Sequence, residues 1–307
     1  MRLFKKTSID FMGKRNLWYT VSATVIIVGM ISLAIKGFDY GIDFLGGTEL
    51  IVQFQNRVEI SAVRGALDRA GLGKAEIKAY GSDRDILIRT TTITTEQGTS
   101  VGDMLRDALK SGFPSNPFTV QKEDKIGPKI GAELRRDAMY AVVASLIAIW
   151  VYVWFRFKFI YGLGAVAALF HDVLVTLGLV SIFDGVMNLE IDQNMIAAFL
   201  TLVGLSVNDT VVIFDRIREN QKIFKTMPLL ELMNKSLNET LSRTIITSGT
   251  IFVVLMVLLV FGGEVNRGFA FTLTVGIVTG TYSSIYIASA VALEWVTRGK
   301  AKGALVK

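Results

Sequence analysis

The sequence predicts a membrane protein that is mostly α-helical, with six transmembrane helices and one extracytoplasmic α+β domain between the first and second spans. Hydrophobic residues make up 51% of the 307 residues, and the mean hydropathy is +0.47. A soluble domain rarely reaches such an average, because its surface needs polar groups. Six apolar runs, each about 17–25 residues long, are long enough to cross the hydrocarbon core of a bilayer as helices.

The first element is an apolar run that follows a basic start. Residues 1–16 are polar and are predicted to be a cytoplasmic N-terminus, and residues 17–36 are predicted to be the first transmembrane helix. A cleaved signal peptide would have a shorter apolar core and a site of small residues after it. This run is longer and no such site follows, so we expect a retained span.

Residues 37–137 carry charges of both signs and are predicted to form the external domain. Apolar residues alternate at strand spacing in some segments and recur at helix spacing in others. The expected elements are a strand at 50–54, a helix at 60–67, strands at 75–80 and 84–89, a helix at 104–109 and a strand at 118–121. Ser100 and Asp103 are predicted to form a capping box for the second helix. The order βαββαβ is that of the ferredoxin-like fold.

The rest of the chain is predicted to be a bundle of five helices, residues 138–294, followed by a cytoplasmic tail, residues 295–307. The expected spans are about 138–155, 160–183, 195–214, 245–261 and 269–293. The last span has a small residue at every fourth position: Gly276, Gly280, Ser284, Ala288 and Ala292. Small residues in such a stripe allow helix backbones to approach closely, although they are also common in spans generally.

Lys and Arg gather in the connections that share a side of the membrane with the N-terminus. These residues are Arg156, Lys158, Arg216, Arg218, Lys222, Lys225, Lys235, Arg298, Lys300, Lys302 and Lys307. The connection 184–194 on the opposite side has three carboxylates and no Lys or Arg. The positive-inside rule therefore predicts that both termini are cytoplasmic and that the large domain is outside. This distribution explains the net charge of +6 without a nucleic-acid partner.

Ionisable residues inside spans are costly and indicate functional sites. Asp209 lies in the fourth span, about 9 Å by helical rise from its cytoplasmic end, and Arg243 begins the fifth span. Arg243, Thr247 and Thr250 share one helix face, Ser206 shares a face with Asp209, and the polar Asn208 directly precedes Asp209. We therefore expect the two helices to pack side by side and form a hydrated proton pathway; the alternative is a structural ion pair.

His171 and Asp172 lie near the middle of the third span. Adjacent residues of a helix point about 100° apart, so we expect the two side chains to face different neighbours. They serve either a proton path or hydrogen bonding between helices. His171 is the only histidine and the chain has no cysteine, so no metal site, disulfide or thiol chemistry is expected. No cofactor is expected either.

Several segments resemble the SecF members of the SecD/SecF family, which is part of the resistance-nodulation-division superfamily. The matching segments are residues 43–48 (Asp-Phe-Leu-Gly-Gly-Thr), 127–131 (Gly-Pro-Lys-Ile-Gly), the pair His171-Asp172, 206–212 with 215–219, and 243–250. The resemblance extends over nearly the whole chain. Residues 93–116 match no motif of the family.

The resemblance implies a subunit of the bacterial inner membrane that is not an enzyme. It would act with SecD beside the SecYEG translocon, surrounded by membrane lipids, and use the proton-motive force to help late-stage translocation of unfolded exported polypeptides. Asp209 and Arg243 would belong to the proton pathway, and SecD would supply a further essential aspartate.

Two other functions are compatible with parts of the sequence. A half-transporter of the same superfamily would export a lipid or small molecule by proton antiport, but its external domain is usually larger. An intramembrane hydrolase would need a nucleophile paired with a base, and no serine is placed by spacing beside His171 and Asp172. A neighbouring gene for a SecD-like protein would favour the export subunit.

Overall fold

The computed structural model describes residues 7–91, 100–157 and 159–304. Parts of both predicted cytoplasmic termini and Lys158 of the predicted basic connection lie outside the described residues. The chain divides into two compact units. We call them the helical unit (Met1–Phe38, Val142–Leu189 and Asn194–Lys307) and the sheet unit (Asp39–Ala141 and Glu190–Gln193).

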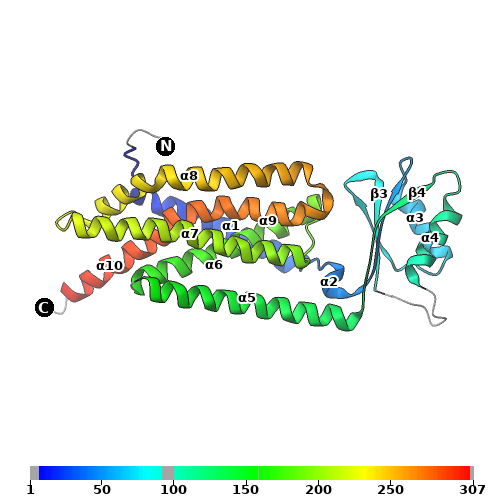
Figure 1. Ribbon diagram of the computed structural model, residues 1–307, viewed down its shortest axis with the longest axis horizontal. Helices are drawn as coiled ribbons and strands as arrows, with labels where there is room; N and C mark the ends of the chain where they lie inside the picture. Colours follow the sequence, from blue (N-terminus) through cyan, green and yellow to red (C-terminus); the bar gives the residue numbers. More distant parts are fainter. Residues whose placement is uncertain (1–6, 92–99, 158, 305–307) are drawn as a thin grey trace. The chain divides into compact units, whose positions relative to one another are not determined.

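The helical unit is built from long helices that run side by side (Figure 1). They are α1 (Arg15–Lys36), α5 (Pro128–Arg156), α6 (Phe159–Met187), α7 (Gln193–Ile223), α8 (Leu229–Phe261), α9 (Gly263–Ser283) and α10 (Ser289–Ala304). A π-helical turn, η2 (Ser284–Ala288), joins α9 to α10 into one continuous stretch. Among the described residues, six helical stretches are long and apolar enough to cross a membrane. The predicted number of spans is therefore confirmed.

Several helices extend beyond the apolar runs that predicted them. Helix α8 begins at Leu229, well before the expected span at 245–261. Its first half has charged residues at every fourth position, Glu231, Lys235, Glu239 and Arg243, and buries the opposite face. This pattern is typical of an amphipathic helix, which continues a transmembrane helix into water.

Residues 7–14, on the N-terminal side of α1, lie against this part of α8. Asn234 accepts hydrogen bonds at Oδ1 from the backbone N–H groups of Phe11 (3.0 Å) and Met12 (2.9 Å). Asn238 accepts one from Ile9 (2.9 Å) and donates one back to the Ile9 carbonyl (2.8 Å). Phe11 and Met12 are buried, so the segment before the first span is part of the packed helical unit.

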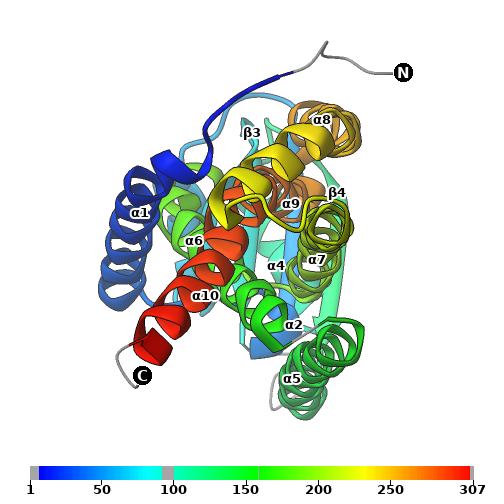
Figure 2. The same ribbon diagram turned by 90° about the vertical axis from the view of Figure 1, so that its left-hand side faces the viewer.

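The stretch α9–η2–α10 lies inside the bundle, with α6, α7 and α8 around it (Figure 2). All five small residues of its predicted stripe are buried. A Cβ atom on Gly276 would lie 2.5 Å from Leu202 of α7, and one on Gly164 of α6 would lie 2.5 Å from the Ala288 carbonyl oxygen. These distances are below normal contact, so the prediction that this stripe allows close helix packing is confirmed.

The sheet unit has the predicted order βαββαβ. Its strands are β1 (Gly47–Phe54), β2 (Glu76–Tyr80), β3 (Ser82–Thr90) and β4 (Phe118–Ile126), and its longer helices are α3 (Ile60–Arg69) and α4 (Val101–Gly112). The sheet order is β2-β3-β1-β4 and every neighbouring pair is antiparallel. Helices α3 and α4 cover one face (Figure 1), where Leu50, Val52, Val63 and Leu105 form the core.

Three predictions for this unit need correction. Ser100 precedes α4 but makes no side-chain cap, and its hydroxyl accepts a hydrogen bond from Lys125 Nζ (2.5 Å). Strand β4 reaches Ile126 rather than 121. The predicted range 37–137 omits Glu190–Gln193, which belongs to the sheet unit. These four residues join it because Ile191 forms a parallel β-bridge with Tyr40.

The Gly-Gly pair at the start of β1 has a clear structural reason. Gly46 and Gly47 have φ values of 71° and 128°, which residues with a Cβ rarely adopt. A Cβ on Gly46 would lie 2.9 Å from Pro128 Cα, and one on Gly131 would lie 3.0 Å from the Gly46 nitrogen. Residues 43–48 and 127–131 are therefore in direct contact, where β1 begins and where β4 leads into α5.

Candidate functional site

Asp209 is buried between α7 and α8. Its side chain is 5% exposed, and Ser248 Oγ on α8 donates a hydrogen bond of 2.9 Å to its Oδ2 atom. Within the described part of the chain, no Lys, Arg or His approaches Asp209 closely enough for an ion pair. The hydrogen bond confirms that the fourth and fifth spans pack side by side.

Arg243 is not the direct partner of Asp209. It is exposed and continues the charged stripe of the first half of α8. It lies close enough for an attractive charge–charge interaction with Asp209, but the two form no direct ion pair. Arg243 therefore acts on this carboxyl group from a distance, and the direct contact comes from Ser248.

The polar face predicted for the fifth span is displaced by about one residue. Thr247 is half-buried and Thr250 is exposed, and Thr250 donates its hydroxyl proton to the Thr247 carbonyl of the same helix (2.8 Å). The buried face contains Thr244 and Ser248 instead. The prediction that the face with Arg243, Thr247 and Thr250 contacts Asp209 is therefore wrong. Asn208 is exposed on α7.

His171 and Asp172 are buried in α6 and contact each other. His171 Nδ1 lies 2.9 Å from Asp172 Oδ1. His171 Nε2 lies 2.8 Å from Ser22 Oγ of α1 and 2.9 Å from the Tyr282 hydroxyl of α9. The histidine therefore bridges α6 to two other helices, and a hydrogen-bonding role between helices accounts for this geometry.

Asp172 points toward α7 and α9. Its Oδ2 atom accepts hydrogen bonds from Ser206 Oγ (2.5 Å) and Ser283 Oγ (2.9 Å). Ser206 therefore belongs to the Asp172 cluster and not to the partners of Asp209. Both residues bond to α9, His171 through Tyr282 and Asp172 through Ser283, so the expectation that they face different neighbours is correct only for their other contacts, with α1 and α7.

Four residues of this site were not predicted: Ser22, Ser248, Tyr282 and Ser283. Each is a neutral hydroxyl residue, and such residues are too common in membrane helices to stand out alone. The small-residue stripe was the one available signal, because Ser283 directly precedes its central member, Ser284. A further hydroxyl pair, Thr210 and Ser284 at 2.8 Å, joins α7 to η2 beside this cluster.

The site combines two carboxyl groups and one imidazole group with several hydroxyl groups. Asp172 and Asp209 are carboxyl groups with neutral donors around them, and His171 has its two nitrogens hydrogen bonded. Across residues 7–91, 100–157 and 159–304, no three His, Cys, Asp or Glu side chains lie together as a metal-binding group. Carboxyl and imidazole side chains are general proton donors and acceptors.

Comparison with known proteins gives a consistent result. A family model described as protein export membrane protein SecD/SecF, C-terminal, matches residues 106–298, and a model of the SecD/SecF GG motif matches residues 31–56. The protein translocase subunit SecF of Rhodothermus marinus is 45% identical over 98% of both chains. That of Desulfurispirillum indicum is 42% identical over 94% of this chain and 92% of its own length.

Two solved structures of SecDF have the same fold. One, from Thermus thermophilus, superposes with a TM-score of 0.83 at 37% identity and covers 95% of this chain. The super-membrane-facing form of SecDF gives a TM-score of 0.72 at 37% identity over the whole chain. This chain spans 39% and 41% of the length of those two chains. With six apolar helical stretches and translocase relatives, it is a multi-pass membrane protein of a protein-transport family. The sequence matches over nearly the full length establish that the chain belongs to the SecD/SecF family of protein export membrane proteins.

Proposed function

We propose that this chain is a SecF-like subunit of a SecDF complex in the bacterial inner membrane. It uses the proton-motive force to assist late-stage translocation of unfolded exported polypeptides through the SecYEG channel. The names of its relatives support the translocase role, and one structural relative is described as translocon-associated. SecD is the expected partner, since the related solved structures contain SecD and SecF together.

The observation that carries the proposal is the environment of Asp209. Its carboxyl group is buried in a membrane-spanning helix, and its direct contact is the Ser248 hydroxyl. A hydroxyl can serve a carboxylate as donor or a carboxylic acid as acceptor. Asp209 can therefore gain or lose a proton without breaking an ion pair, which is what a proton carrier requires.

Arg243 supplies the fixed charge in this mechanism. When Asp209 is ionised, Arg243 attracts it from the surface of α8; when Asp209 is protonated, that attraction disappears. The relative energy of different α7–α8 arrangements then depends on the proton. A change in helix packing that follows a change in charge is the usual way in which such switches act.

The His171–Asp172 cluster is the second part of the proposed pathway. Ser206 of α7 donates to Asp172 of α6 and lies three residues before Asp209, so α7 carries both Asp209 and a hydrogen-bond partner of Asp172. Thr210 and Ser284 extend this set of hydroxyl groups. A proton that reaches Asp172 would rearrange the hydroxyl groups of Ser206 on α7 and Ser283 on α9. A proton that reaches Asp209 would rearrange the Ser248 hydroxyl on α8.

The membrane orientation belongs to the same proposal. Both termini are cytoplasmic and the sheet unit is extracytoplasmic, on the side where an exported chain emerges. The exposed apolar residues of the helices contact lipid or SecD, and no cofactor is required because the proton is the coupling ion.

The test is Asp209→Asn in cells that carry only this copy of the gene. We expect export of a slow-folding secreted protein to lose the part that an uncoupler abolishes, because asparagine cannot exchange a proton. The matched control is Asn208→Ala, which changes the exposed neighbour and should retain that part. Full uncoupler-sensitive export in Asp209→Asn would contradict the proposed role of Asp209.

Protein level separates this result from a folding defect. Asparagine still accepts a hydrogen bond from Ser248, and no direct ion pair is broken. The free energy of unfolding should therefore fall by no more than about 1 kcal/mol, the net value of one hydrogen bond. Normal membrane levels and normal copurification with SecD are expected. Degradation of the variant would indicate that Asp209 is needed for the fold.

A further inference from the structure

A row of charged residues crosses the face of the sheet that lies opposite α3 and α4. The strand register places Glu76 beside Arg89, Arg89 beside Glu49, and Glu49 beside Asp124. The row therefore runs through all four strands in the order β2-β3-β1-β4. Cross-strand neighbours on one face are close enough to interact directly.

Arg89 is the centre of this row and is only 4% exposed. Its guanidinium group pairs with Glu49 (2.8 Å) and Glu76 (3.4 Å) on neighbouring strands and with Glu190. A buried arginine needs such partners, because an unpaired buried charge is strongly unfavourable. Glu190 differs from the other two because it comes from the connection between α6 and α7.

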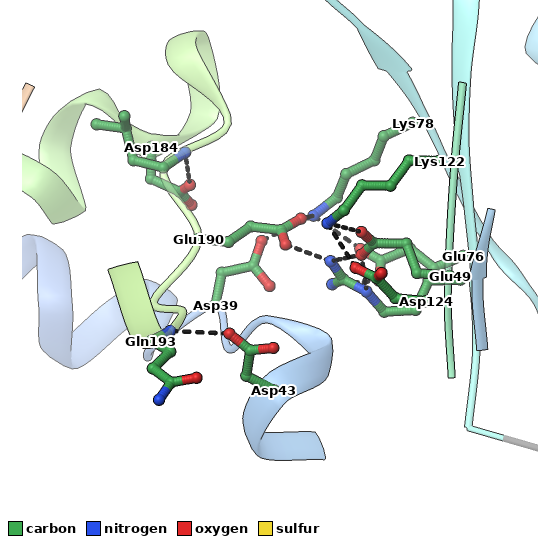
Figure 3. A network of polar contacts seen from close by, with 12 residues as sticks. Asp39, Asp43, Glu49, Glu76, Lys78, Lys122, Asp124, Asp184, Glu190 and Gln193 are labelled. Atoms are coloured by element: carbon green, nitrogen blue, oxygen red, sulfur yellow. Dashed lines mark hydrogen bonds and ion pairs between the residues drawn. The ribbon is translucent and has the colours of Figure 1, made fainter. Parts of the chain in front are cut away.

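Lys78 makes a second link to the same connection. Its ammonium group lies 2.7 Å from Asp39, 2.8 Å from Glu76 and 3.4 Å from Glu190. Figure 3 shows the Glu190 carboxylate pointing toward Lys78. Glu190 therefore pairs with Arg89 and Lys78, and these two cations also pair with carboxylates on the strands.

Backbone groups fix the same four residues. The Ile191 amide donates to the Asp39 carbonyl (2.7 Å) and the Gly41 amide donates to the Ile191 carbonyl (2.9 Å). The Gln193 amide donates to Asp43 Oδ2 (2.9 Å). Residues 190–193 thus make side-chain and backbone contacts over their whole length, which is unusual for a short loop between helices.

We propose that Glu190 is a positioning residue which, through Arg89 and Lys78, fixes the connection between α6 and α7 to the sheet, so that movements of these two helices are transmitted to the sheet. This inference rests on the proposed function, because α6 carries Asp172 and α7 carries Asp209. It adds the route by which a proton bound in the membrane acts on the extracytoplasmic domain.

The connection is short enough to transmit such movements. Helix α6 ends at Met187, three residues before Glu190, and α7 begins at Gln193. Three extended residues span about 10 Å at most, so there is little slack. From Asp172 to the end of α6, and from the start of α7 to Asp209, the rise is about 22–24 Å of regular helix. Each helix can therefore act as a rigid arm between a buried carboxyl group and Glu190.

Burial raises the pKa of Glu190, and the attraction of Arg89 and Lys78 only partly offsets it. A neutral acceptor at this position should therefore dock as well as glutamate does. A positive charge should not, because Arg89 and Lys78 would repel it. Loss of Glu190 still leaves Arg89 paired with Glu49 and Glu76, so the sheet unit is expected to stay folded.

The experiment compares Glu190→Arg with Glu190→Gln in the full chain with its SecD partner. Docking of residues 190–193 is measured by hydrogen exchange of the Ile191 amide. Export is measured as the fraction of secretion of a slow-folding protein that an uncoupler abolishes. Protonation of Asp209 is measured by the pH profile of its labelling with dicyclohexylcarbodiimide, which reacts with protonated carboxyl groups. Glu123→Gln is the control, because Glu123 pairs with Arg106 and Lys125 in the same unit.

We expect Glu190→Arg to expose the Ile191 amide and to reduce uncoupler-sensitive export at least about fivefold, the lower end of typical coupling between linked sites. Asp209 should still titrate in the labelling experiment, with a shifted midpoint because coupling between linked sites is reciprocal. Glu190→Gln and Glu123→Gln should behave as the wild type in all three measurements. A lost labelling profile would overturn the inference, because Glu190 would then act on the proton site itself.

A disulfide provides the rescue. Tyr40 and Ile191 are bridge partners, and the chain has no cysteine. Tyr40→Cys with Ile191→Cys, added to Glu190→Arg, should restore export when oxidised and not when reduced. The inference is overturned if Glu190→Arg leaves Ile191 protected, if it exposes Ile191 but retains export, or if the disulfide forms without restoring export. Failure of the Asp209→Asn test would be a separate result, visible with Glu190 unchanged.

Discussion

At the scale of single residues, the two buried aspartates of the helical unit share one kind of neighbour. Asp172 accepts hydrogen bonds from Ser206 and Ser283, and Asp209 accepts one from Ser248. A hydroxyl group can rotate and either donate or accept, whereas a lysine or arginine side chain can only donate. These surroundings tolerate both charge states of a carboxyl group, so hydroxyl residues are as important to the site as the acids themselves.

Glu190 makes a pH prediction at the same scale. Its pKa in the folded protein is raised above the ordinary value of 4.5 because the side chain is buried. The docked loop therefore binds a proton more readily than the open loop. Its stabilising contribution is complete below about pH 4.5 and declines as the pH rises through the folded pKa. We expect protection of the Ile191 amide, corrected for intrinsic exchange, to decline over this range.

The comparison with Glu190→Gln isolates this effect from the other carboxylates of the cluster. Glutamine does not titrate, so the difference in protection between the wild type and the variant should shrink or reverse as the pH rises. A difference that grows with pH would contradict the burial-dominated pKa of Glu190 and would mean that the ion pair with Arg89 dominates.

The sequence predicts the acidic residues of the site better than their partners. Asp209 and the His171–Asp172 pair are visible because charged or titratable groups interrupt apolar runs. Ser248 is not visible, because Thr247, Ser248 and Thr250 look equally polar and only the packing of α8 decides which one faces α7. The sequence suggests Arg243 as a partner of Asp209 only because the two residues lie at a similar depth in the membrane. Arg243 instead lies on the exposed side of α8, in line with the charged residues that precede it.

At the scale of elements, α1 and α6 approach each other through glycine. A Cβ atom on Gly29 would lie 2.4 Å from Gly178 Cα. We expect Gly29→Ala to force the two helices apart and to lower the free energy of unfolding by about 1–3 kcal/mol, as overpacking usually does. The measurement is denaturant unfolding of the purified protein in detergent.

Gly204→Ala is the matched control for this prediction. Gly204 lies in α7, and a Cβ atom there would have no heavy atom within 4 Å. Alanine is a better helix former than glycine by about 0.5–1 kcal/mol, so this variant should be equally or more stable than the wild type. Equal destabilisation by both substitutions would show that close contact at Gly29 is not the cause.

Elements whose apolar residues recur at a regular spacing could be predicted from the sequence. Short elements and strands at the edge of the sheet could not. Leu50, Val52 and Phe54 alternate because β1 is a central strand with one face on the core. Strand β4 lies at the edge of the sheet and much of it is exposed, so its later residues show no alternation. The docking of residues 190–193 depends on partners far away in the sequence, and no local pattern reports it.

At the scale of the whole molecule, the distribution of Lys and Arg predicts the orientation in the membrane. Lys74 follows α3 in the sheet unit, and Thr226 lies in the connection between α7 and α8; both are exposed. At Lys74 we expect activity from a reporter that works only outside the cytoplasm. At Thr226 we expect activity from a reporter that works only in the cytoplasm. Activity on the opposite sides would require the reverse orientation.

The π turn η2 explains how small residues spaced four apart can stay on one side of the stretch α9–η2–α10. In a plain α-helix, residues four apart drift by about 40°, so a five-member stripe would wind through about 160°. The wider i→i+5 turn rotates each residue less and sets the phase back. The segment thus contains one residue more than an unbroken α-helix between the same neighbours would need. A deletion within it could be absorbed by rewinding, whereas a deletion one turn earlier would rotate every later side chain by about 100° against all the surrounding helices.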